Sequence, residues 1–260
     1  MRQIVVVALF TSSFTALAWG PEGHSLVARI AEAQLTPAAR ARVTAILAPG
    51  QTLASIASWA DEVRRSRPES ANWHFIDIPI DQPHLDMSRD CAKDDCVVAK
   101  IADLRKTLLN PATPADQQRE ALMFLVHFIG DMHQPLHSSD NKDRGGNSVR
   151  VVFFDRQTNL HSVWDSGLLS RLAPADQLFP TLSAESMRRR KKWSKGTVEQ
   201  WADQNHRAAQ KVVYGRLPKV AAGTPVPLGA EYEKVADPLI LEQLEKAGAR
   251  LAAVLNETLR

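Results

Sequence analysis

The chain has 260 residues, of which 32 are lysine or arginine and 29 are aspartate or glutamate, so its formal net charge is +3. This near balance is weak evidence for a polyanionic partner and no evidence against one. After the first eighteen residues, no uninterrupted apolar run approaches the ~20 residues that a membrane-spanning helix needs. The composition therefore argues against a membrane-embedded protein, and the length suits one large or two small domains.

The first eighteen residues have the pattern of a secretory signal peptide. Arg2 supplies a positive start, residues 4–17 are mostly apolar, and residues 16–18 form a small-x-small cleavage site. We therefore expect export out of the cell or into the periplasm, with cleavage after Ala18. The mature protein would then be a single domain, residues 19–260, that begins with Trp19.

Apolar residues at intervals of three and four predict helices along most of the remaining chain. They are expected at residues 25–35, 36–47, 53–65, 97–109, 115–132, 184–192, 197–214 and 238–259. Extended character is confined to residues 73–80 and 147–154, and residues 217–229 are expected to form a loop. The predicted fold class is mainly α, a single helical domain with a small β-hairpin.

Cys91 and Cys96 are the only cysteines, five residues apart in a polar segment. In an exported protein this spacing predicts a local disulfide that closes a small loop. A two-cysteine metal site is the lesser alternative, because no histidine lies close by in the sequence.

His127 and Asp131 are four residues apart within a strongly apolar predicted helix, so both side chains lie on one face of it. A buried imidazole and a buried carboxylate need polar partners, and a metal ion would satisfy both. One such pair alone is weak evidence, since histidine and aspartate at this spacing often only hydrogen-bond to each other.

The same spacing recurs in His161 and Asp165, and His137 follows the proline that ends the helix. Two pairs, together with His24 close to an exported N-terminus, favour a metal centre with more than one ion. Nitrogen and carboxylate ligands without thiolate favour zinc over manganese or nickel.

Six motifs occur in a fixed order between Trp19 and Asp165. They are Trp19-Gly20-x-x-Gly23-His24, Ser58-Trp59-Ala60-Asp61-x-x-Arg64, His74-Phe75-Ile76-Asp77, His127-Phe128-Ile129-Gly130-Asp131-Met132-His133-Gln134-Pro135-Leu136-His137, Gly145-Gly146-Asn147 and His161-Ser162-x-Trp164-Asp165. Together they resemble the S1/P1-type nucleases, the single-strand-preferring enzymes with three zinc ions. The helical C-terminal part agrees with this family in character but adds little motif content.

The resemblance implies nine ligand residues for three zinc ions. The first ion would be bound by Asp61, His74, His127 and Asp131; the second by the amino and carbonyl groups of Trp19, by His24 and by Asp131; the third by His137, His161 and Asp165. Asp131 would bridge the first two ions. Cleavage after Ala18 would be essential, because an amide nitrogen at residue 19 does not bind a metal as an amine does.

The resemblance also implies the catalytic and substrate-binding roles. Arg64 would steady the phosphate beside the catalytic carboxylates Asp61 and Asp131; Phe75 would stack on a base, Asp77 would accept hydrogen bonds from a base edge, and Asn147 would shape the same cleft. The expected reaction is hydrolysis of single-stranded DNA and RNA to 5′-phosphorylated products. The protein is expected to be a monomer, without a stable protein partner or a membrane anchor.

Two other functions compete with this interpretation. A zinc phospholipase C would share the helical fold and the three-zinc site, and a periplasmic zinc-scavenging protein would need neither Arg64 nor Asp77. Arg65 is an alternative to Arg64 if the helix register shifts. The remaining histidines are not expected to bind metal: His133 would hydrogen-bond behind the site, His84 would lie in a loop, and His206 on a helix surface.

Overall fold

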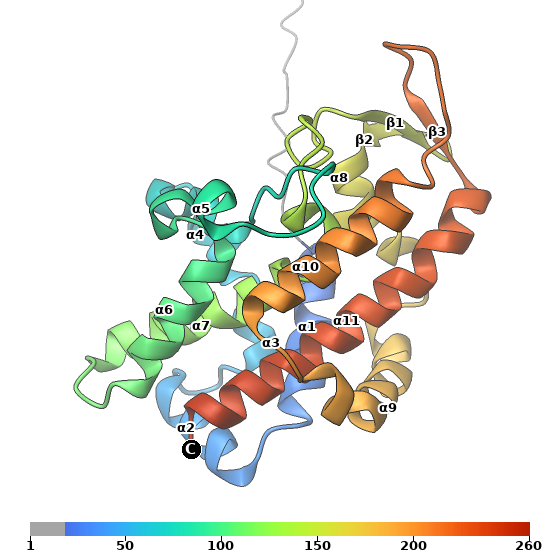
Figure 1. The fold of residues 1–260 in the computed structure, drawn as a ribbon. Helices are drawn as coiled ribbons and strands as arrows, with labels where there is room; N and C mark the ends of the chain where they lie inside the picture. Colours follow the sequence, from blue (N-terminus) through green and yellow to red (C-terminus); the bar gives the residue numbers. More distant parts are fainter. Residues whose placement is uncertain (1–18) are drawn as a thin grey trace, which may run out of the picture.

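The computed structural model describes residues 19–260, and most of them form helices that pack against one another, with the three strands at one end of the molecule (Figure 1). The predicted signal peptide lies outside the described residues. The helices are α1 (Pro21–Glu32), α2 (Pro37–Ile46), α3 (Leu53–Ile56), α4 (Trp59–Val63), α5 (Met87–Asp90), α6 (Val97–Leu109), α7 (Ala115–Asp131), α8 (Leu160–Ser162), α9 (Ala175–Trp193), α10 (Val198–Ala208) and α11 (Ala230–Thr258). The strands are β1 (Arg150–Phe153), β2 (Arg156–Asn159) and β3 (Val226–Leu228). Short 3₁₀ or π turns at Pro68–His74, Ala92–Asp94, Pro135–Ser138, Val163–Gly167, Leu169–Arg171 and Ala209–Tyr214 connect them. The mainly α fold class is confirmed.

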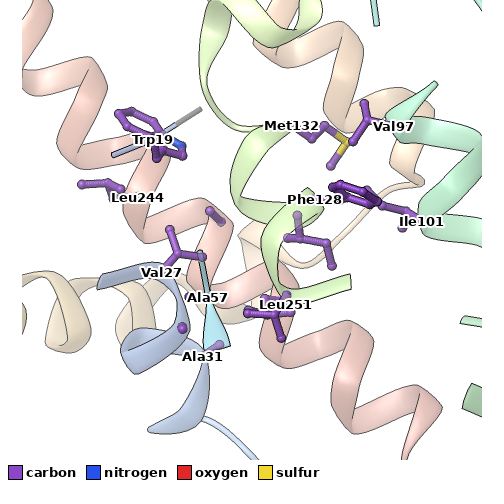
Figure 2. Packing of buried hydrophobic residues seen from close by; sticks show 14 of the residues in the cluster. Trp19, Val27, Ala31, Ala57, Val97, Ile101, Phe128, Met132, Leu244 and Leu251 are labelled. Carbon is purple, nitrogen blue, oxygen red and sulfur yellow. The ribbon is translucent and has the colours of Figure 1, made fainter. Parts of the chain in front are cut away.

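Helix α7 is the central element, and every residue of its last three turns is buried. It contacts α1, α2, α3, α4, α6 and α11. Figure 2 shows Phe128 and Met132 on one side of α7, pointing toward Ile101 and Val97 of α6. The apolar side chains thus hold α7 in the core, and its remaining face is left to carry His127 and Asp131.

Helices α1 and α11 form the most extensive helix pair, and α11 runs alongside α1 in Figure 1. The close approach depends on Gly248, where a Cβ atom would come within 2.3 Å of Ile30 Cγ2. The backbones therefore touch where no side chain intervenes. This packing fixes α1, whose first turn carries His24.

The strands form a small sheet in the order β2-β1-β3. The predicted hairpin is present: β1 pairs antiparallel with β2, with Val151 opposite Thr158. β3 pairs parallel with β1 through Val151 and Val226. The prediction of a loop at residues 217–229 was therefore wrong for β3, because its partner strand lies about seventy-five residues away in sequence and local patterning carries no trace of it.

Two other predicted elements differ from the structure. Residues 53–65 form two short helices, α3 and α4, instead of one. Residues 73–80 are not a strand: Pro68–His74 is a 3₁₀ turn, and only Pro79 forms an isolated bridge, with Asp140. The extended residues after the turn hydrogen-bond to the loop that follows α7, so this segment belongs to the site and not to a sheet.

Several helices are longer than predicted. α1 begins at Pro21, four residues before the predicted start, because proline suits the first turn of a helix. α9 and α11 continue through Pro180 and Pro238. Proline removes one helical hydrogen bond, and here packing against the core outweighs that local cost.

Cys91 and Cys96 form a disulfide, which confirms the predicted local loop. Disulfides of this kind are typical of proteins that fold in an oxidising compartment. Among residues 19–260, no helix is both long enough and apolar enough to cross a membrane.

Candidate metal centre

The structure brings all eight predicted ligand side chains together in three adjoining groups. In each group the ligand atoms lie within 4.8 Å of one another: His24, His127 and Asp131; Asp61, His74 and His127; and His137, His161 and Asp165. The first two groups share His127, and we call their five residues the Asp131 cluster. The third group is called the Asp165 cluster.

Asp131 lies at the centre of its cluster. One carboxylate oxygen, Oδ1, lies 3.2 Å from His24 Nε2. The other, Oδ2, lies 2.8 Å from His74 Nδ1 and 3.1 Å from His127 Nε2. The two oxygens therefore face different histidines, which is the geometry of a carboxylate that bridges two ligand sets.

Several buried polar atoms of this cluster have no hydrogen-bond partner among residues 19–260. They include Asp61 Oδ1, and also Asp131 Oδ1 and His24 Nε2, whose 3.2 Å contact with each other does not have the geometry of a hydrogen bond. Asp61 Oδ1 is 3.6 Å from His127 Nε2 and 3.8 Å from His74 Nδ1, which is too far for a hydrogen bond. Unsatisfied buried polar atoms are costly. A metal ion coordinated among them removes that cost, so the residues present fit a metal.

The Asp165 cluster also fits a metal ion, because the lone pairs of two imidazoles point toward each other. His137 Nδ1 donates to the carbonyl of His74 (2.8 Å), and His161 Nδ1 donates to the carbonyl of Gly145 (2.6 Å). Because a carbonyl only accepts, each Nδ1 carries the ring hydrogen. The two Nε2 atoms then face each other at 3.2 Å with their lone pairs, and Asp165 Oδ2 lies 3.4 Å from His161 Nε2.

Protonation does not relieve this contact. Burial lowers the pKa of His137 to about 4, and burial together with the neighbouring His137 lowers the pKa of His161 to about 3. Both rings are therefore neutral near pH 7. Burial raises the pKa of Asp165 well above its usual range. A cation between these groups would favour the ionised carboxylate, so two neutral imidazoles and Asp165 form a suitable set of ligands for it.

The Asp131 cluster is more anionic. Burial alone would raise the pKa of Asp131, but the surrounding histidines, His127 first, hold it well below its usual range. The pKa of Asp61 is also lowered, against the effect of burial, by His127. Two carboxylates are therefore ionised here.

The polar residues behind the ligands include three that the sequence analysis did not identify. Gln134 Nε2 donates to Asp165 Oδ1 (2.6 Å), and Gln134 Oε1 accepts from the amide of Leu136 (2.6 Å). Asn205 of α10 donates to the carbonyls of Met132 (2.7 Å) and Gln134 (2.8 Å). Gln243 of α11 donates to Asn205 Oδ1 and so fixes the orientation of that amide. Gln134 is flanked by ligand-bearing residues, a clue within the sequence; Asn205 and Gln243 carry no such clue.

The first residues of the described chain lie against the Asp165 cluster. The Trp19 side chain is fully buried, and the amide of Gly20 donates to the carbonyl of Asp165 (2.8 Å). A Cβ atom at Gly20 would come within 2.4 Å of Ser166 Oγ, so a side chain there would require the Ser166 hydroxyl to move. The backbone at residues 19 and 20 is therefore held beside Asp165.

His24 depends on a second glycine. Its ring stacks on the ring of His127 with a centroid distance of 4.0 Å. A Cβ atom at Gly130 of α7 would lie 2.8 Å from His24 Nδ1. The absence of a side chain at Gly130 therefore lets the α1 imidazole approach α7.

Arg64 follows Asp61 on the same short helical segment. Its guanidinium donates to the carbonyl of Ala71 (3.1 Å). Its positive charge contributes to the lowered pKa values of His74, His137 and His161, so the guanidinium lies near both clusters. Arg65, by contrast, is exposed.

The three predicted base-binding residues lie on two neighbouring segments. Phe75 is half-buried and directly follows His74, while Asp77 is exposed at residue level. The carboxylate of Asp77 is nevertheless partly shielded from water. This desolvation, and to a lesser extent the negative charges of Asp140 and Asp143, raise the pKa of Asp77 to about 6. Asn147 donates to the carbonyl of Arg144 (2.8 Å). The amide of Asp140 donates to the carbonyl of Ile78 (2.9 Å), which joins the two segments.

The remaining histidines lie outside the three ligand groups. His133 Nδ1 donates to the carbonyl of Ile129 (2.6 Å), and its Nε2 accepts from the buried Arg250 (2.8 Å). The side chain of His84 is 68% exposed. The predicted surface position of His206 was wrong: it is buried and hydrogen-bonds to Ser139 Oγ (2.6 Å) and to the carbonyl of Gln82 (2.8 Å).

The fold and the site together define a mainly helical protein with adjoining histidine–aspartate ligand sets suited to metal ions. A family model described as "S1/P1 Nuclease" matches residues 19–260. The chain is 34% identical to nuclease P1 of Penicillium citrinum over 266 residues, which cover 92% of this chain and 97% of that protein. It is 32% identical to endonuclease 2 of Arabidopsis thaliana over 284 residues, covering 98% and 96% of the two chains. It is 31% identical to nuclease S1 of Aspergillus oryzae over 265 residues, covering 92% and 91%.

The chain therefore belongs to the S1/P1 nuclease family. It is a nuclease that hydrolyses phosphodiester bonds, and its substrates are nucleic acids. The predicted family resemblance is confirmed.

Proposed function

We propose that the mature protein, beginning at Trp19, binds three zinc ions and hydrolyses single-stranded DNA and RNA to 5′-phosphorylated products. The observation that supports this most directly is the Asp131 carboxylate, whose two oxygens face His24 on one side and His74 and His127 on the other. The adjoining Asp165 cluster supplies a third ligand set. Ligands that are nitrogen or carboxylate oxygen, without thiolate, favour zinc.

The proposed ligand sets differ from the three groups in one respect: Asp131, whose two oxygens face different histidines, would be the shared residue in place of His127. One zinc ion would be held by Asp61, His74, His127 and Asp131, a second by the amino and carbonyl groups of Trp19 with His24 and Asp131, and a third by His137, His161 and Asp165. When bound, the ions would lower the pKa of water and neutralise negative charge on the phosphate.

The side chains of the chain itself would orient the substrate. The Arg64 guanidinium, fixed by the carbonyl of Ala71, is suited to donate to a phosphate oxygen near both clusters. The Asp61 and Asp131 carboxylates would hold the catalytic ligand sets together. Burial of the clusters excludes bulk water, which strengthens each of these charge interactions.

The base-binding residues are proposed to be Phe75, Asp77 and Asn147. Phe75 would stack on a base, and stacking tolerates any sequence because every base has a π-face. Asp77 in its ionised form would accept hydrogen bonds from amino groups on a base edge. Asn147 would shape the adjoining cleft. Dephosphorylation of 3′-nucleotides is part of the same proposal, because a terminal phosphate would occupy the same cluster.

Export and maturation complete the proposal. Residues 1–18 would be removed as a signal peptide, and the single nuclease domain, residues 19–260, would act as a monomer in the periplasm or outside the cell. The buried Trp19 side chain and the hydrogen bond from Gly20 to Asp165 support an N-terminus that is part of the site.

The proposal is tested by measuring zinc per chain in the mature protein and analysing the ends of the products from a single-stranded oligonucleotide. We expect three zinc ions per chain and 5′-phosphate ends. Activity that survives complete metal removal would refute the metal mechanism. Turnover of phosphatidylcholine without cleavage of nucleic acid would favour the phospholipase alternative.

The N-terminal ligand has its own test. A form with one extra residue before Trp19 should lose one zinc ion and most activity, since its residue 19 nitrogen is an amide. Full activity of that form would remove the amine from the ligand set, while the eight side-chain ligands could stand.

A further inference from the structure

The disulfide loop between Cys91 and Cys96 carries Asp95, whose carboxylate hydrogen-bonds to the two residues that precede His74. Asp95 Oδ2 accepts from Asn72 Nδ2 (2.8 Å), and Asp95 Oδ1 accepts from Trp73 Nε1 (2.8 Å). Both carboxylate oxygens are therefore used, and both partners directly precede His74.

The loop also has a backbone connection to this segment. Immediately after the disulfide, the amide of Val97 donates to the carbonyl of Phe75 (3.0 Å). Within the loop, Lys93 and Asp94 both have positive φ angles, 60° and 55°. The short covalent loop and its tight turn limit the positions that Asp95 can adopt, so its carboxylate is pre-organised to receive the two donors.

The segment held in this way reaches both clusters. His74 supplies a ligand atom to the Asp131 cluster, and its carbonyl accepts from Nδ1 of His137 in the Asp165 cluster (2.8 Å). The amide of Ile76 donates back to the carbonyl of His137 (2.8 Å). A shift of residues 72–76 would therefore move one ligand of each cluster, together with the Phe75 ring.

The Trp73 ring also contacts side chains of α6 and α7. The ammonium group of Lys100 on α6 lies 5.0 Å from the Trp73 ring centroid, and the ring packs edge-on against Phe124 of α7. Asp95 accepts a hydrogen bond from Nε1, the one polar atom of the indole. Without it, the ring would keep its packing partners but lose the bond that sets its orientation.

We propose that Asp95 is a positioning residue: through Asn72 and Trp73 it holds His74 and Phe75 in the geometry that binds nucleotide and metal. It touches neither substrate nor metal, and the disulfide acts by fixing Asp95. This inference rests on the proposed function for the roles of His74 and Phe75.

The test compares Asp95→Ala, which removes both acceptors, with Asp95→Asn, which retains one oxygen. Asp103→Ala is the matched control, because it removes an exposed carboxylate on α6 whose ion pair with Lys106 is worth little. On a dinucleotide substrate, Asp95→Ala should raise KM roughly tenfold with a smaller change in kcat, since two charge-assisted hydrogen bonds are lost. Asp95→Asn should fall between this variant and the wild type, and Asp103→Ala should match the wild type.

The second readout does not depend on activity. In metal-free, ¹⁵N-labelled protein the indole N–H resonance of Trp73, identified by its loss in Trp73→Phe, should move upfield in Asp95→Ala and stay in place in Asp103→Ala. An unchanged indole resonance would overturn the proposal. So would an unchanged KM in a Asp95→Ala variant that remains folded at the assay temperature, as measured by its thermal unfolding.

The role of the disulfide is tested by a double-mutant cycle. Replacing both cysteines by serine should itself raise KM, and adding Asp95→Ala in that background should change KM by less than about twofold, because coupled residues are not additive. Full additivity would overturn the proposed link between the disulfide and Asp95. If instead the wild-type protein shows no zinc-dependent cleavage, the proposed function fails, while the indole resonance still reports whether Asp95 holds Trp73.

Discussion

The Asp131 and Asp165 clusters adjoin each other but are built in different ways. The Asp131 cluster is centred on α7, where helix geometry alone places His127 and Asp131 on one face. The Asp165 cluster is built from a 3₁₀ turn, Pro135–Ser138, and from a short helix that continues into the π turn Val163–Gly167. Such widened turns are frequent at functional sites.

The electrostatics of the two clusters differ as well. Histidines hold the pKa of Asp131 well below its usual range, whereas burial raises the pKa of Asp165 well above its usual range. The Asp131 cluster stabilises its charge with its own ligands. The Asp165 carboxylate instead accepts a hydrogen bond from Gln134, which lies outside the cluster. We therefore expect the Asp131 cluster to be weakened mainly by substitution of its own residues. We expect the Asp165 cluster to be weakened also by substitution of Gln134, which hydrogen-bonds to it.

The largest expected effect breaks the Asp131 cluster. In Asp131→Asn, one carboxylate that faces three histidines becomes a neutral amide. We expect the loss of metal from both groups of this cluster and a fall in activity well beyond the roughly 10–100-fold that changes to outer partners produce. Zinc per chain and kcat on a single-stranded oligonucleotide measure this; retention of all bound zinc would contradict a bridging role.

The next effect should be confined to the other cluster. His161→Ala removes one of the two imidazoles of the Asp165 cluster and leaves every ligand of the Asp131 cluster in place. We expect one zinc ion fewer per chain, with the other two retained, and a large loss of kcat. Loss of all three ions would mean that the clusters do not bind metal independently.

A smaller effect is expected when Gln134, which hydrogen-bonds to Asp165, is replaced and the ligand residues are left in place. Gln134→Met keeps the side-chain volume but removes the hydrogen bond to Asp165. We expect a loss of roughly 10–100-fold in metal affinity, at the Asp165 cluster alone. Gln177→Met, at an exposed glutamine of α9, is the control. Equal weakening of all the sites in a chelator titration would show that Gln134 supports the fold and not this cluster.

The smallest effect concerns Asp77, which lies outside both clusters. Its pKa is raised to about 6, so the carboxylate is ionised above that pH and becomes protonated as the pH falls through it. Because only the ionised form accepts two hydrogen bonds from a base, KM for an amino-bearing base should rise several-fold between pH 7 and pH 5. The Asp77→Asn variant should lack this part of the pH dependence. The same slope in both proteins would assign the effect to other groups, such as the metal ligands.

The sequence by itself determined much of this protein. The spacing of His127 and Asp131 within an apolar helix indicated a buried metal ligand pair, because the pitch of a helix fixes which residues share a face. The Cys91–Cys96 disulfide, the mainly α fold and the family followed from local patterns and from the order of the motifs. The assignments of individual ligands and base-binding residues stay predictions until they are tested.

Only the tertiary structure decided the rest. The parallel partner of β3 lies more than seventy residues away in the sequence. The backbone of residues 76–80 hydrogen-bonds to residues 137 and 140, which follow α7, and not to a neighbouring strand of a sheet. The supports Asn205 and Gln243 come from α10 and α11, and His206 is buried because two distant segments close over it. Buried backbone and side-chain amide groups in a turn hydrogen-bond to the segments that pack against them. Which segments these are depends on the tertiary fold, and the spacing of nearby residues in the sequence does not predict it.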